Sequence, residues 1–409
     1  MKESELLLRE IQEALFSEST VAKIWGVASS TLDSSSPPTK TPEYSDGRYH
    51  FRDIDHWTAG FFSGSVAALI ERQTKYPSKF PSAKIHPLKL EFASKWWAEG
   101  LVAQAPRTDT HDLGFIIEPT FRREFEQSKS EKALNCLRTA AKSLASRFDE
   151  RVGVIRSWDT TENKRHAFED KNKDFLVIID NMCNLNMLYY VASITGDLSL
   201  STIATTHADN TLKNHFREAE WSSYHVVNYD VHTGLPRAKF THQGYSDEST
   251  WARGQAWAIL GFAETYLWTK QSKFLQAAIS IAEVFSSKLP ADGVPPWDFD
   301  APDKDRKDAS AAMISALGFI KIFEATKNEQ FLTNGLKLVR DTISLSLTNQ
   351  SKIDSHGDVT FGEYDTILKD STINNNPDTY ERLVDHGLVY ADYYFLTIGN
   401  KLLELGLYI

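Results

Sequence analysis

The chain has 409 residues, of which 41% are hydrophobic and 12% aromatic, a composition that suits a globular protein with a large core. Its 45 Lys and Arg residues stand against 55 Asp and Glu residues, and this net charge of −10, without a basic stripe, argues against a nucleic-acid partner. The two cysteines, Cys136 and Cys183, exclude a disulfide framework and are expected to be buried free thiols in apolar helices.

The N-terminal stretch MKESELLLREIQEALF is charged and amphipathic, and it lacks the uninterrupted apolar core of a secretion signal. No apolar run in the sequence approaches the roughly 20 residues that a membrane span needs. These features predict a cytoplasmic protein with no membrane partner.

Helical periodicity dominates the rest of the chain. In chain order it predicts helices over residues 3–26, 57–73, 88–103, 111–127, 131–148, 180–195, 199–216, 249–268, 272–288, 308–326, 329–347 and 387–405. Strand-like stretches such as YHVVNYD are few and short, and we expect them as hairpins in long loops. No Gly/Ser linker or long charge run divides the chain, so residues 1–409 are predicted to form one domain.

The predicted helices alternate between two kinds. One kind is poor in charge and rich in small and aromatic residues, as in WTAGFFSGSVAALI, whereas the other is charged and amphipathic, as in EKALNCLRTAAKSLASRF. Six charge-poor helices begin near residues 57, 111, 180, 249, 308 and 387. This alternation predicts an all-α fold, a single (α/α)6 barrel in which six helical hairpins form a toroid. An irregular bundle or an open solenoid is the alternative.

In such a barrel the inner helices run parallel, so their N-termini, with free N–H groups and partial positive charge, meet at one mouth. The long connections before the inner helices would surround this mouth: 27–56, 149–179, 217–248, 289–307 and 348–386. Carboxylates, imidazoles and indoles recur at the starts of these helices. That pattern is typical of a polar, aromatic-lined pocket for a sugar.

Three aspartates, Asp112, Asp180 and Asp308, stand where an Asp could cap a helix. Asp180 is distinctive because it follows the apolar FLVII and starts a helix without other charges; burial would raise its pKa and suit a proton donor. Asp308 is interpreted as a cap. His111 with Asp112 could bind a metal, but no third ligand follows at a recognisable spacing, so no metal or other cofactor is predicted.

The stretch THQGYSDESTWARGQAWAILGF places one Arg among tryptophans at the start of an apolar helix. Arg253 and Trp257 are four residues apart and share a helix face, whereas Trp251 is expected in the core. A buried Arg is costly unless an anionic ligand or a distant acid pairs with it.

Taken in order, the segments HWTAGFF, HDLGF, IIDN, HQGYSDESTWARGQAW, PPWDF, DASAA and ADYYFL resemble the unsaturated glucuronyl hydrolases of glycoside hydrolase family 88. The resemblance covers about residues 50–400. It implies an enzyme that removes the non-reducing-end 4,5-unsaturated glucuronic acid from lyase-generated oligosaccharides by hydrating the C4=C5 bond. An acid protonates C4, water adds at C5, the hemiketal opens, and the sugar at C1 is lost.

The resemblance also implies roles for individual residues. Asp180 matches the general acid and base, and Asp112 matches a second carboxylate that supports the transition state and binds hydroxyls. The positions that hold the sugar or assist water match His225, Gln243, Arg253 and Trp257, and the pocket walls match Trp57, His111 and Phe115. Arg253 is thereby expected to face the substrate carboxylate or the reaction centre. Near 365–376, where the family chooses sulfated or unsulfated neighbouring sugars, the sequence departs from the family pattern, and Ser371 and Thr372 align only loosely.

Several alternatives stay open at this point. The unsaturated rhamnogalacturonyl hydrolases of family 105 are similar to the chain, though more distantly. A sugar epimerase on the same barrel would shuttle protons with several His residues, whereas this mouth has acids and indoles. A non-catalytic sugar-binding barrel would keep Trp57, Trp257 and Arg253 but would have no reason to bury Asp180. The expected partners are unsaturated uronic-acid oligosaccharides, and the chain is expected to be a monomer or homodimer.

Overall fold

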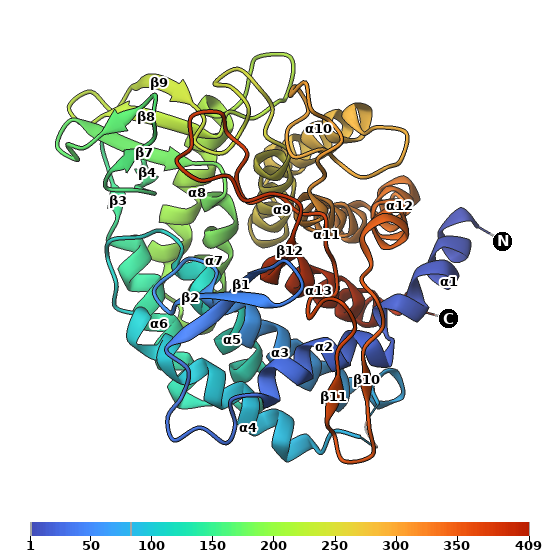
Figure 1. Ribbon diagram of the computed structural model, residues 1–409. Coiled ribbons are helices and arrows are strands. Elements are labelled where there is room, and N and C mark those ends of the chain that lie inside the picture. Colours follow the sequence, from blue (N-terminus) through green and yellow to red (C-terminus); the bar gives the residue numbers. More distant parts are fainter. Residues whose placement is uncertain (1, 82–83, 409) are drawn as a thin grey trace.

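The computed structural model describes residues 2–81 and 84–408, and this part of the chain is mostly helical rather than all-α (Figure 1). The charge-poor helices are α3 (Ala59–Lys75), α5 (Leu113–Ser128), α7 (Asn181–Thr195), α9 (Ala252–Thr269), α11 (Ala309–Thr326) and α13 (Val389–Glu404). The other helices are α1 (Glu3–Leu15), α2 (Glu18–Ser29), α4 (Pro87–Ala98), α6 (Glu131–Ala145), α8 (Leu198–Asn214), α10 (Ser272–Lys288) and α12 (Glu329–Ser346).

The predicted helices are present within a few residues of their expected ends, except at the N-terminus. The prediction of one helix over 3–26 is wrong, because α1 ends at Leu15 and α2 begins at Glu18. The hydroxyl of Ser17 accepts a hydrogen bond from the N–H of Thr20 and so caps a new helix. The predicted helix over 88–103 also changes character, since α4 ends at Ala98 and continues as the 3-10 helix Glu99–Gln104.

The charge-poor helices form a closed ring (Figure 1). Each packs against the next in the order α3, α5, α7, α9, α11 and α13, and α13 packs back against α3. The helices that follow them, α4, α6, α8, α10 and α12, each pack on the inner helix before them in the chain. Among the described helices only α11 is long and apolar enough to cross a membrane, and 78% of it is buried within this ring. Cys136 and Cys183 are buried free thiols, as predicted.

Glycines let neighbouring inner helices approach closely. A Cβ added to Gly60 of α3 would lie 2.3 Å from the carbonyl oxygens of Phe115 and Ile116 in α5. A Cβ on Gly114 of α5 would lie 2.5 Å from the Oδ1 atom of Asn184 in α7. The spacing of these helices therefore depends on residues without a side chain.

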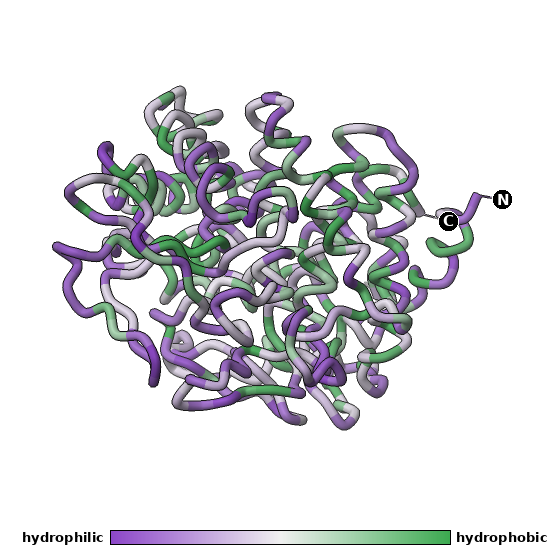
Figure 2. Tube along the Cα trace, turned by 90° about the horizontal axis from the view of Figure 1, so that it is seen from above, coloured by the Kyte–Doolittle hydropathy of each residue, from purple (hydrophilic) through white to green (hydrophobic). Residues whose placement is uncertain are grey.

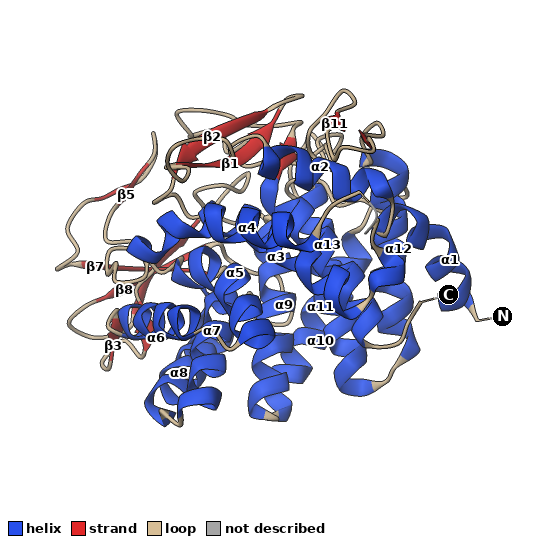
Figure 3. Ribbon diagram, turned by 90° about the horizontal axis from the view of Figure 1, so that it is seen from below, coloured by secondary structure: helices blue, strands red, loops and turns tan. Residues whose placement is uncertain are grey.

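Short strands lie outside the ring (Figure 3). Many of the outermost segments of the chain are hydrophilic (Figure 2). One antiparallel sheet joins β1 (Lys40–Ser45) to both β2 (Tyr49–Asp53) and β12 (Gly387–Leu388), and another has the order β7 (Asp174–Ile178), β8 (Val226–Asp230), β9 (Pro236–Phe240). The two-stranded pairs are β3 (Phe148–Asp149) with β4 (Val154–Ile155), β5 (Thr161–Glu162) with β6 (Ala167–Phe168), and β10 (Lys352–Ile353) with β11 (Val359–Thr360). The predicted hairpin at YHVVNYD is confirmed, and β7 extends it to three strands.

Candidate active site

The β7–β8–β9 sheet brings three of the predicted site residues to one edge. Asp180 follows the end of β7, His225 precedes β8, and Gln243 follows β9. Because the strands are antiparallel, with Ile178 opposite Val226 and Val226 opposite Phe240, all three positions lie at the same end of the sheet. The strand β7 therefore explains the apolar run before Asp180, which sequence analysis treated only as the approach to a helix.

The three aspartates at inner-helix starts behave differently. Asp308 caps α11, since its carboxylate accepts hydrogen bonds from the N–H groups of Ser310 and Ala311. Asp112 and Asp180 occupy the same position at α5 and α7, but neither side chain makes a capping hydrogen bond. Capping therefore accounts for Asp308 and leaves the other two carboxyl groups for another task.

Asp180 is a buried carboxyl group with spare hydrogen-bonding capacity. Its side chain is 8% exposed, and its Oδ1 atom has no hydrogen-bond partner among the described residues. Burial raises the pKa of Asp180 to about 7, and the charge of Asp112 adds to this rise while Arg253 opposes it. A carboxyl group in this state holds a proton near neutral pH and can donate it.

Asp112 is held at the mouth by its neighbours in the sequence. The hydroxyl of Thr110 donates to its Oδ2 atom at 2.9 Å, and Nε2 of His111 lies 3.2 Å from its Oδ1 atom. His111 is fully buried, and burial lowers its pKa, so its imidazole is neutral at pH 7. These contacts orient the second carboxylate without supplying a full positive charge.

An aromatic wall joins the starts of four inner helices. Trp57 is half-buried and contacts Phe115 and Tyr390, with ring centroids 5.8 Å and 5.1 Å away. Phe115 contacts Trp257 in turn at 5.0 Å, and Trp257 is completely buried. Trp57 and Phe115 therefore form the face that a sugar ring can meet, while Trp257 supports Phe115 from behind. Trp251 is buried, as expected.

His225 presents a hydrogen-bond donor. Its Nδ1 atom accepts a hydrogen bond from the backbone N–H of His242, so in the neutral imidazole the proton resides on Nε2. Burial lowers the pKa of His225 well below its usual value, which keeps the ring neutral. The Nε2 atom has no partner among the described residues. Such a donor can hold a sugar hydroxyl or a water molecule.

Arg253 has a protein partner that sequence analysis did not identify. Its guanidinium donates to Asp308 at 2.7 Å and to the carbonyl oxygens of Thr372 and Ile373 at 2.6 and 2.7 Å. Gln243 also donates to the carbonyl oxygen of Ile373, at 3.0 Å. The distant acid that balances the buried Arg is thus Asp308, and in this structure Arg253 and Gln243 hold the segment before β12. Asp308 is both a cap and an ion-pair partner.

Several known proteins are similar to this chain in sequence. An unsaturated glucuronyl hydrolase of Formosa agariphila is 34% identical over 345 residues, which span 83% of this chain and 78% of that protein. The chain belongs to the unsaturated glucuronyl hydrolase family. An unsaturated chondroitin disaccharide hydrolase of Streptococcus pneumoniae is 29% identical over 359 residues, 87% of this chain and 84% of that protein. No family model matches the chain.

Solved structures of the unsaturated glucuronyl hydrolase family share the fold. An unsaturated glucuronyl hydrolase specific for heparin superposes with a TM-score of 0.78 at 29% identity, covering 98% of this chain and 100% of that one. The unsaturated glucuronyl hydrolase of Bacillus sp. GL1 gives a TM-score of 0.76 at 24% identity over 95% and 97% of the two chains. As a member of this family the chain is a glycoside hydrolase, and the resemblance found in the sequence is confirmed.

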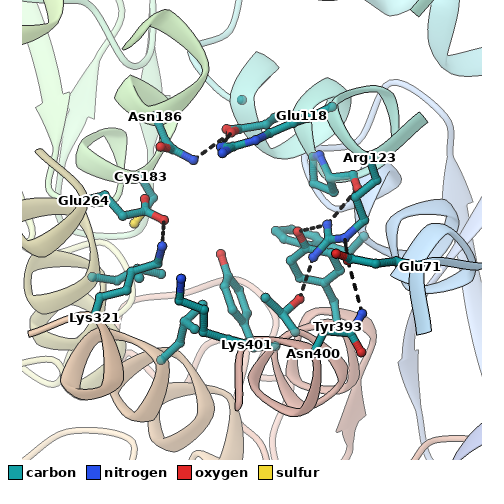
Figure 4. A pocket seen from close by; sticks show the side chains of 18 of the residues that line it. Glu71, Glu118, Arg123, Cys183, Asn186, Glu264, Lys321, Tyr393, Asn400 and Lys401 are labelled. Atoms are coloured by element: carbon teal, nitrogen blue, oxygen red, sulfur yellow. Dashed lines mark hydrogen bonds and ion pairs between the residues drawn. The ribbon is translucent and has the colours of Figure 1, made fainter. Parts of the chain in front are cut away.

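A cavity of this unsaturated glucuronyl hydrolase lies at the opposite end of the ring, where the inner helices end (Figure 4). It measures about 330 Å³, and Phe61 and Phe115 are among the residues that line it. Its charged side chains are already paired: Arg123 with Glu71, for example, and Lys321 with Glu264. This pairing distinguishes the cavity from the mouth, where buried Asp180 and His225 atoms have no partner among the described residues.

Polar contacts around this cavity link every neighbouring pair of inner helices, and we call them the polar girdle. They are Arg123–Glu71 (α5 to α3), Glu118–Asn186 (α5 to α7), Trp268–Asn186 (α9 to α7), Lys321–Glu264 (α11 to α9), Lys401–Glu324 (α13 to α11) and Asn400–Glu71 (α13 to α3). The girdle therefore ties the inner helices to one another around this cavity.

Sequence analysis missed some residues near the site. Tyr390, at the start of α13, is buried against Trp57, and the Arg253 guanidinium lies 5.5 Å from its ring centroid. His386 lies just before β12 and stacks obliquely on Tyr44 at 5.0 Å. Both lie at the start of the sixth charge-poor helix, in the segment DHGLVYADYYF, from which no residue was selected. Among the described residues, no three His, Cys, Asp or Glu side chains gather in a way that could hold a metal ion.

Proposed function

We propose that the chain removes a 4,5-unsaturated glucuronic acid from the non-reducing end of lyase-generated oligosaccharides by hydrating its C4=C5 bond. We further propose that the closed ring, with an outer helix beside each inner one, is an (α/α)6 barrel whose helix starts form the active site. The observation that carries the function is Asp180: a buried carboxyl group with a raised pKa, beside a second carboxyl group that also leaves its helix uncapped.

The first step requires a proton donor at neutral pH. Asp180 holds such a proton and passes it to C4, which leaves positive charge shared between C5 and the ring oxygen. The carboxylate of Asp112, held by Thr110, stabilises this charge. Trp57 and Phe115 pack on the C–H faces of the sugar and fix its position.

The second step adds water at C5 and returns a proton. Asp180, now ionised, accepts a proton from the attacking water, and the Nε2–H group of His225 holds an oxygen nearby. The product is a hemiketal at C5, which opens to a ketone. The hemiacetal left at C1 then releases the second sugar, and Asp180 is again protonated for the next cycle.

The test compares a 4,5-unsaturated glucuronide with the saturated glucuronide that carries the same aglycone. We expect the unsaturated compound to be consumed, with loss of the ultraviolet absorbance of its alkene, while the saturated one survives because it offers no double bond to protonate. Asp180→Asn should lose about 10²- to 10⁴-fold in rate, the usual share of a general acid. The circular dichroism spectrum should be unchanged.

Comparable hydrolysis of both glucuronides would contradict hydration and make Asp112 and Asp180 an ordinary pair of glycosidase carboxylates. Near wild-type turnover by the Asn variant would contradict the role of Asp180. Asp109→Asn is the matched control, since Asp109 is an exposed carboxylate three residues before Asp112 that pairs with Arg107. Its rate should stay close to that of the wild type.

A further inference from the structure

The stretch HQGYSDESTWARGQAW contains an aspartate that takes no part in the proposed chemistry. Asp247 lies in the loop between β9 and α9, four residues after Gln243. Its side chain is 17% exposed, and its carboxylate binds groups on two sides. These contacts connect the surface of the molecule to the active-site residue His225.

On its outer side, Asp247 binds the β5–β6 hairpin. The guanidinium of Arg165 lies 2.7 Å from its Oδ2 atom, and Nε2 of His166 lies 3.3 Å from its Oδ1 atom. The ring of His166 also packs on Phe168 of β6 and on Phe240 of β9, with ring centroids 5.9 Å and 4.8 Å away. The hairpin is thereby attached to the end of β9, and two cationic or polar partners orient the carboxylate of Asp247.

On its inner side, Asp247 holds the chain at the end of β9. Its Oδ1 atom accepts a hydrogen bond of 3.0 Å from the backbone N–H of Thr241, which directly follows β9. Thr241 is buried, and its hydroxyl lies 3.3 Å from Nδ1 of His225. The next residue, His242, donates its backbone N–H to the same Nδ1 atom at 3.1 Å. Asp247 therefore holds the short segment that contacts the His225 ring.

The hydrogen bond to Nδ1 decides what His225 offers to a ligand. A neutral imidazole carries its proton on one nitrogen, and an N–H donor at Nδ1 keeps that proton on Nε2. If residues 241–242 moved away, the proton could reside on Nδ1, and Nε2 would become an acceptor. The carbonyl oxygen of His225 also accepts a hydrogen bond of 3.0 Å from the N–H of Ile179, the residue before Asp180. The position of His225 is thus linked to that of the general acid.

We infer that Asp247 is a positioning residue for the hydration of the C4=C5 bond: through Thr241 and His242 it fixes the tautomer in which Nε2 of His225 is the donor. This inference rests on the proposed function, in which that donor holds an oxygen near C5. Asp247 acts through the backbone of this segment and does not touch the substrate. A partner behind the ring sets the tautomer of metal-binding histidines in the same way.

The direct test measures the tautomer. In protein that contains isotope-labelled histidine, proton–nitrogen correlation spectra distinguish a ring nitrogen that carries a proton from one that does not. The variant His225→Gln identifies the His225 signals by their loss. We expect Nε2 to carry the proton in the wild type, and we expect Asp247→Ala to show the Nδ1–H form or a mixture of both tautomers. This measurement requires no substrate.

Activity provides the second measurement. Asp247→Ala should lower kcat/KM for the unsaturated glucuronide by about 10- to 100-fold, the loss that follows when the partner behind a metal-bound histidine is removed. Asp247→Asn keeps an oxygen that can accept the Thr241 N–H, so it should retain the wild-type tautomer and lose less than about fivefold. The lost charge has a small effect because the Arg165 side chain is 49% exposed, and exposed ion pairs contribute little.

Asp174→Ala is the matched control. Asp174 lies at the opposite end of the same sheet, its side chain is 14% exposed, and it pairs with Arg237 at 3.3 Å. It also accepts a hydrogen bond from the side chain of Asn228. The substitution should lower the midpoint of thermal unfolding about as much as Asp247→Ala does, because similar contacts are lost. It should leave the His225 tautomer and kcat/KM unchanged.

The outcomes separate the inference from the function beneath it. If the wild type does not consume the unsaturated glucuronide, the proposed function is wrong and the role of Asp247 in hydration fails with it. The spectra then still decide whether Asp247 fixes the His225 ring. An unchanged tautomer in a folded Asp247→Ala would overturn the inference, whatever the rate. Equal losses of activity in Asp247→Asn and Asp247→Ala, or in Asp174→Ala and Asp247→Ala, would overturn it as well.

Discussion

Three aspartates occupy the same position on three inner helices, and their surroundings give each a different property. Asp308 binds the free N–H groups of α11 and pairs with Arg253. The side chains of Asp112 and Asp180 make no such capping hydrogen bond. An Asp is favoured at every helix start, so the residue type alone does not identify the acid. The proton held by Asp180 follows from its burial and from the charge of Asp112, and is thus a property of the pair.

This dependence gives a prediction for the pH profile. In the wild type, kcat/KM should fall above about pH 7, tenfold per unit, as Asp180 ionises. Asp112→Asn removes a negative charge that raises the pKa of Asp180, so its alkaline limb should move to lower pH whatever its absolute rate. The measurement is kcat/KM from pH 5 to pH 9. Asp109→Asn should leave the midpoint in place, and an unmoved midpoint in Asp112→Asn would contradict the coupling.

At the scale of the elements, the site depends on one small sheet and on the spacing of two helices. The β7–β8–β9 register places Asp180, His225 and Gln243 at one edge, and a slip of one residue would turn these side chains to the other face. The spacing of α3 and α5 sets the distance between Trp57 and Asp112. The two helices cannot accept an added side-chain atom between them, because Gly60 lies against the backbone of α5.

Gly60→Ala should therefore damage both stability and activity. The new methyl group meets two backbone carbonyl oxygens, which cannot rotate away as a side chain could, so overpacking should cost about 1–3 kcal/mol or more. We expect a lower midpoint of denaturant unfolding and a reduced kcat/KM. Gly406→Ala, where an added Cβ meets nothing within 4 Å, should cost about 1 kcal/mol for its positive φ and leave activity intact. Similar effects of the two substitutions would contradict the tight α3–α5 contact.

The helices were predictable because their signals are local. Charge-poor and charged segments alternate, and an Asp stands at the start of α5, α7 and α11. The cap at Ser17 and the change to a 3-10 helix after α4 were overlooked. The pairing of Arg253 with Asp308 and with the Thr372 carbonyl was not predictable, because 55 and 119 residues separate the partners. The role of β7 was hidden for a related reason: a short apolar run fits a buried strand or the approach to a helix equally well.

At the scale of the whole molecule, the polar girdle makes stability depend on pH. Glu118 is buried within it, where its carboxylate binds Arg122 and Asn186. Burial raises the pKa of Glu118 to about 7; Arg122 and Lys321 oppose this rise, and Glu264 adds to it. Because this folded-state pKa lies above the usual value, the protonated form is favoured by folding. Its contribution to stability is complete at low pH and is lost as the pH rises through 7.

Glu118→Gln should weaken this dependence, since Gln keeps the shape and cannot ionise. Between pH 5 and pH 8, the loss in unfolding free energy should be smaller than in the wild type by about 1–3 kcal/mol. Glu126→Gln is the control, because Glu126 binds the same Arg122 but is a more exposed residue. Urea unfolding at several pH values measures the effect. Parallel curves for wild type and Glu118→Gln would contradict a titrating carboxyl group in the girdle.

The contact between α13 and α3 also sets the timing of assembly on the ribosome. Trp57 and Tyr390 touch across this contact, although 333 positions separate them in the chain. At about 5–20 residues per second, roughly 20 to 70 seconds of translation pass between the two residues. Throughout that time the apolar face of α3 that packs on α13 stays uncovered, and the aromatic wall lacks Tyr390. The nascent protein is thus inactive until its last inner helix has emerged, and it needs protection from aggregation for the whole interval.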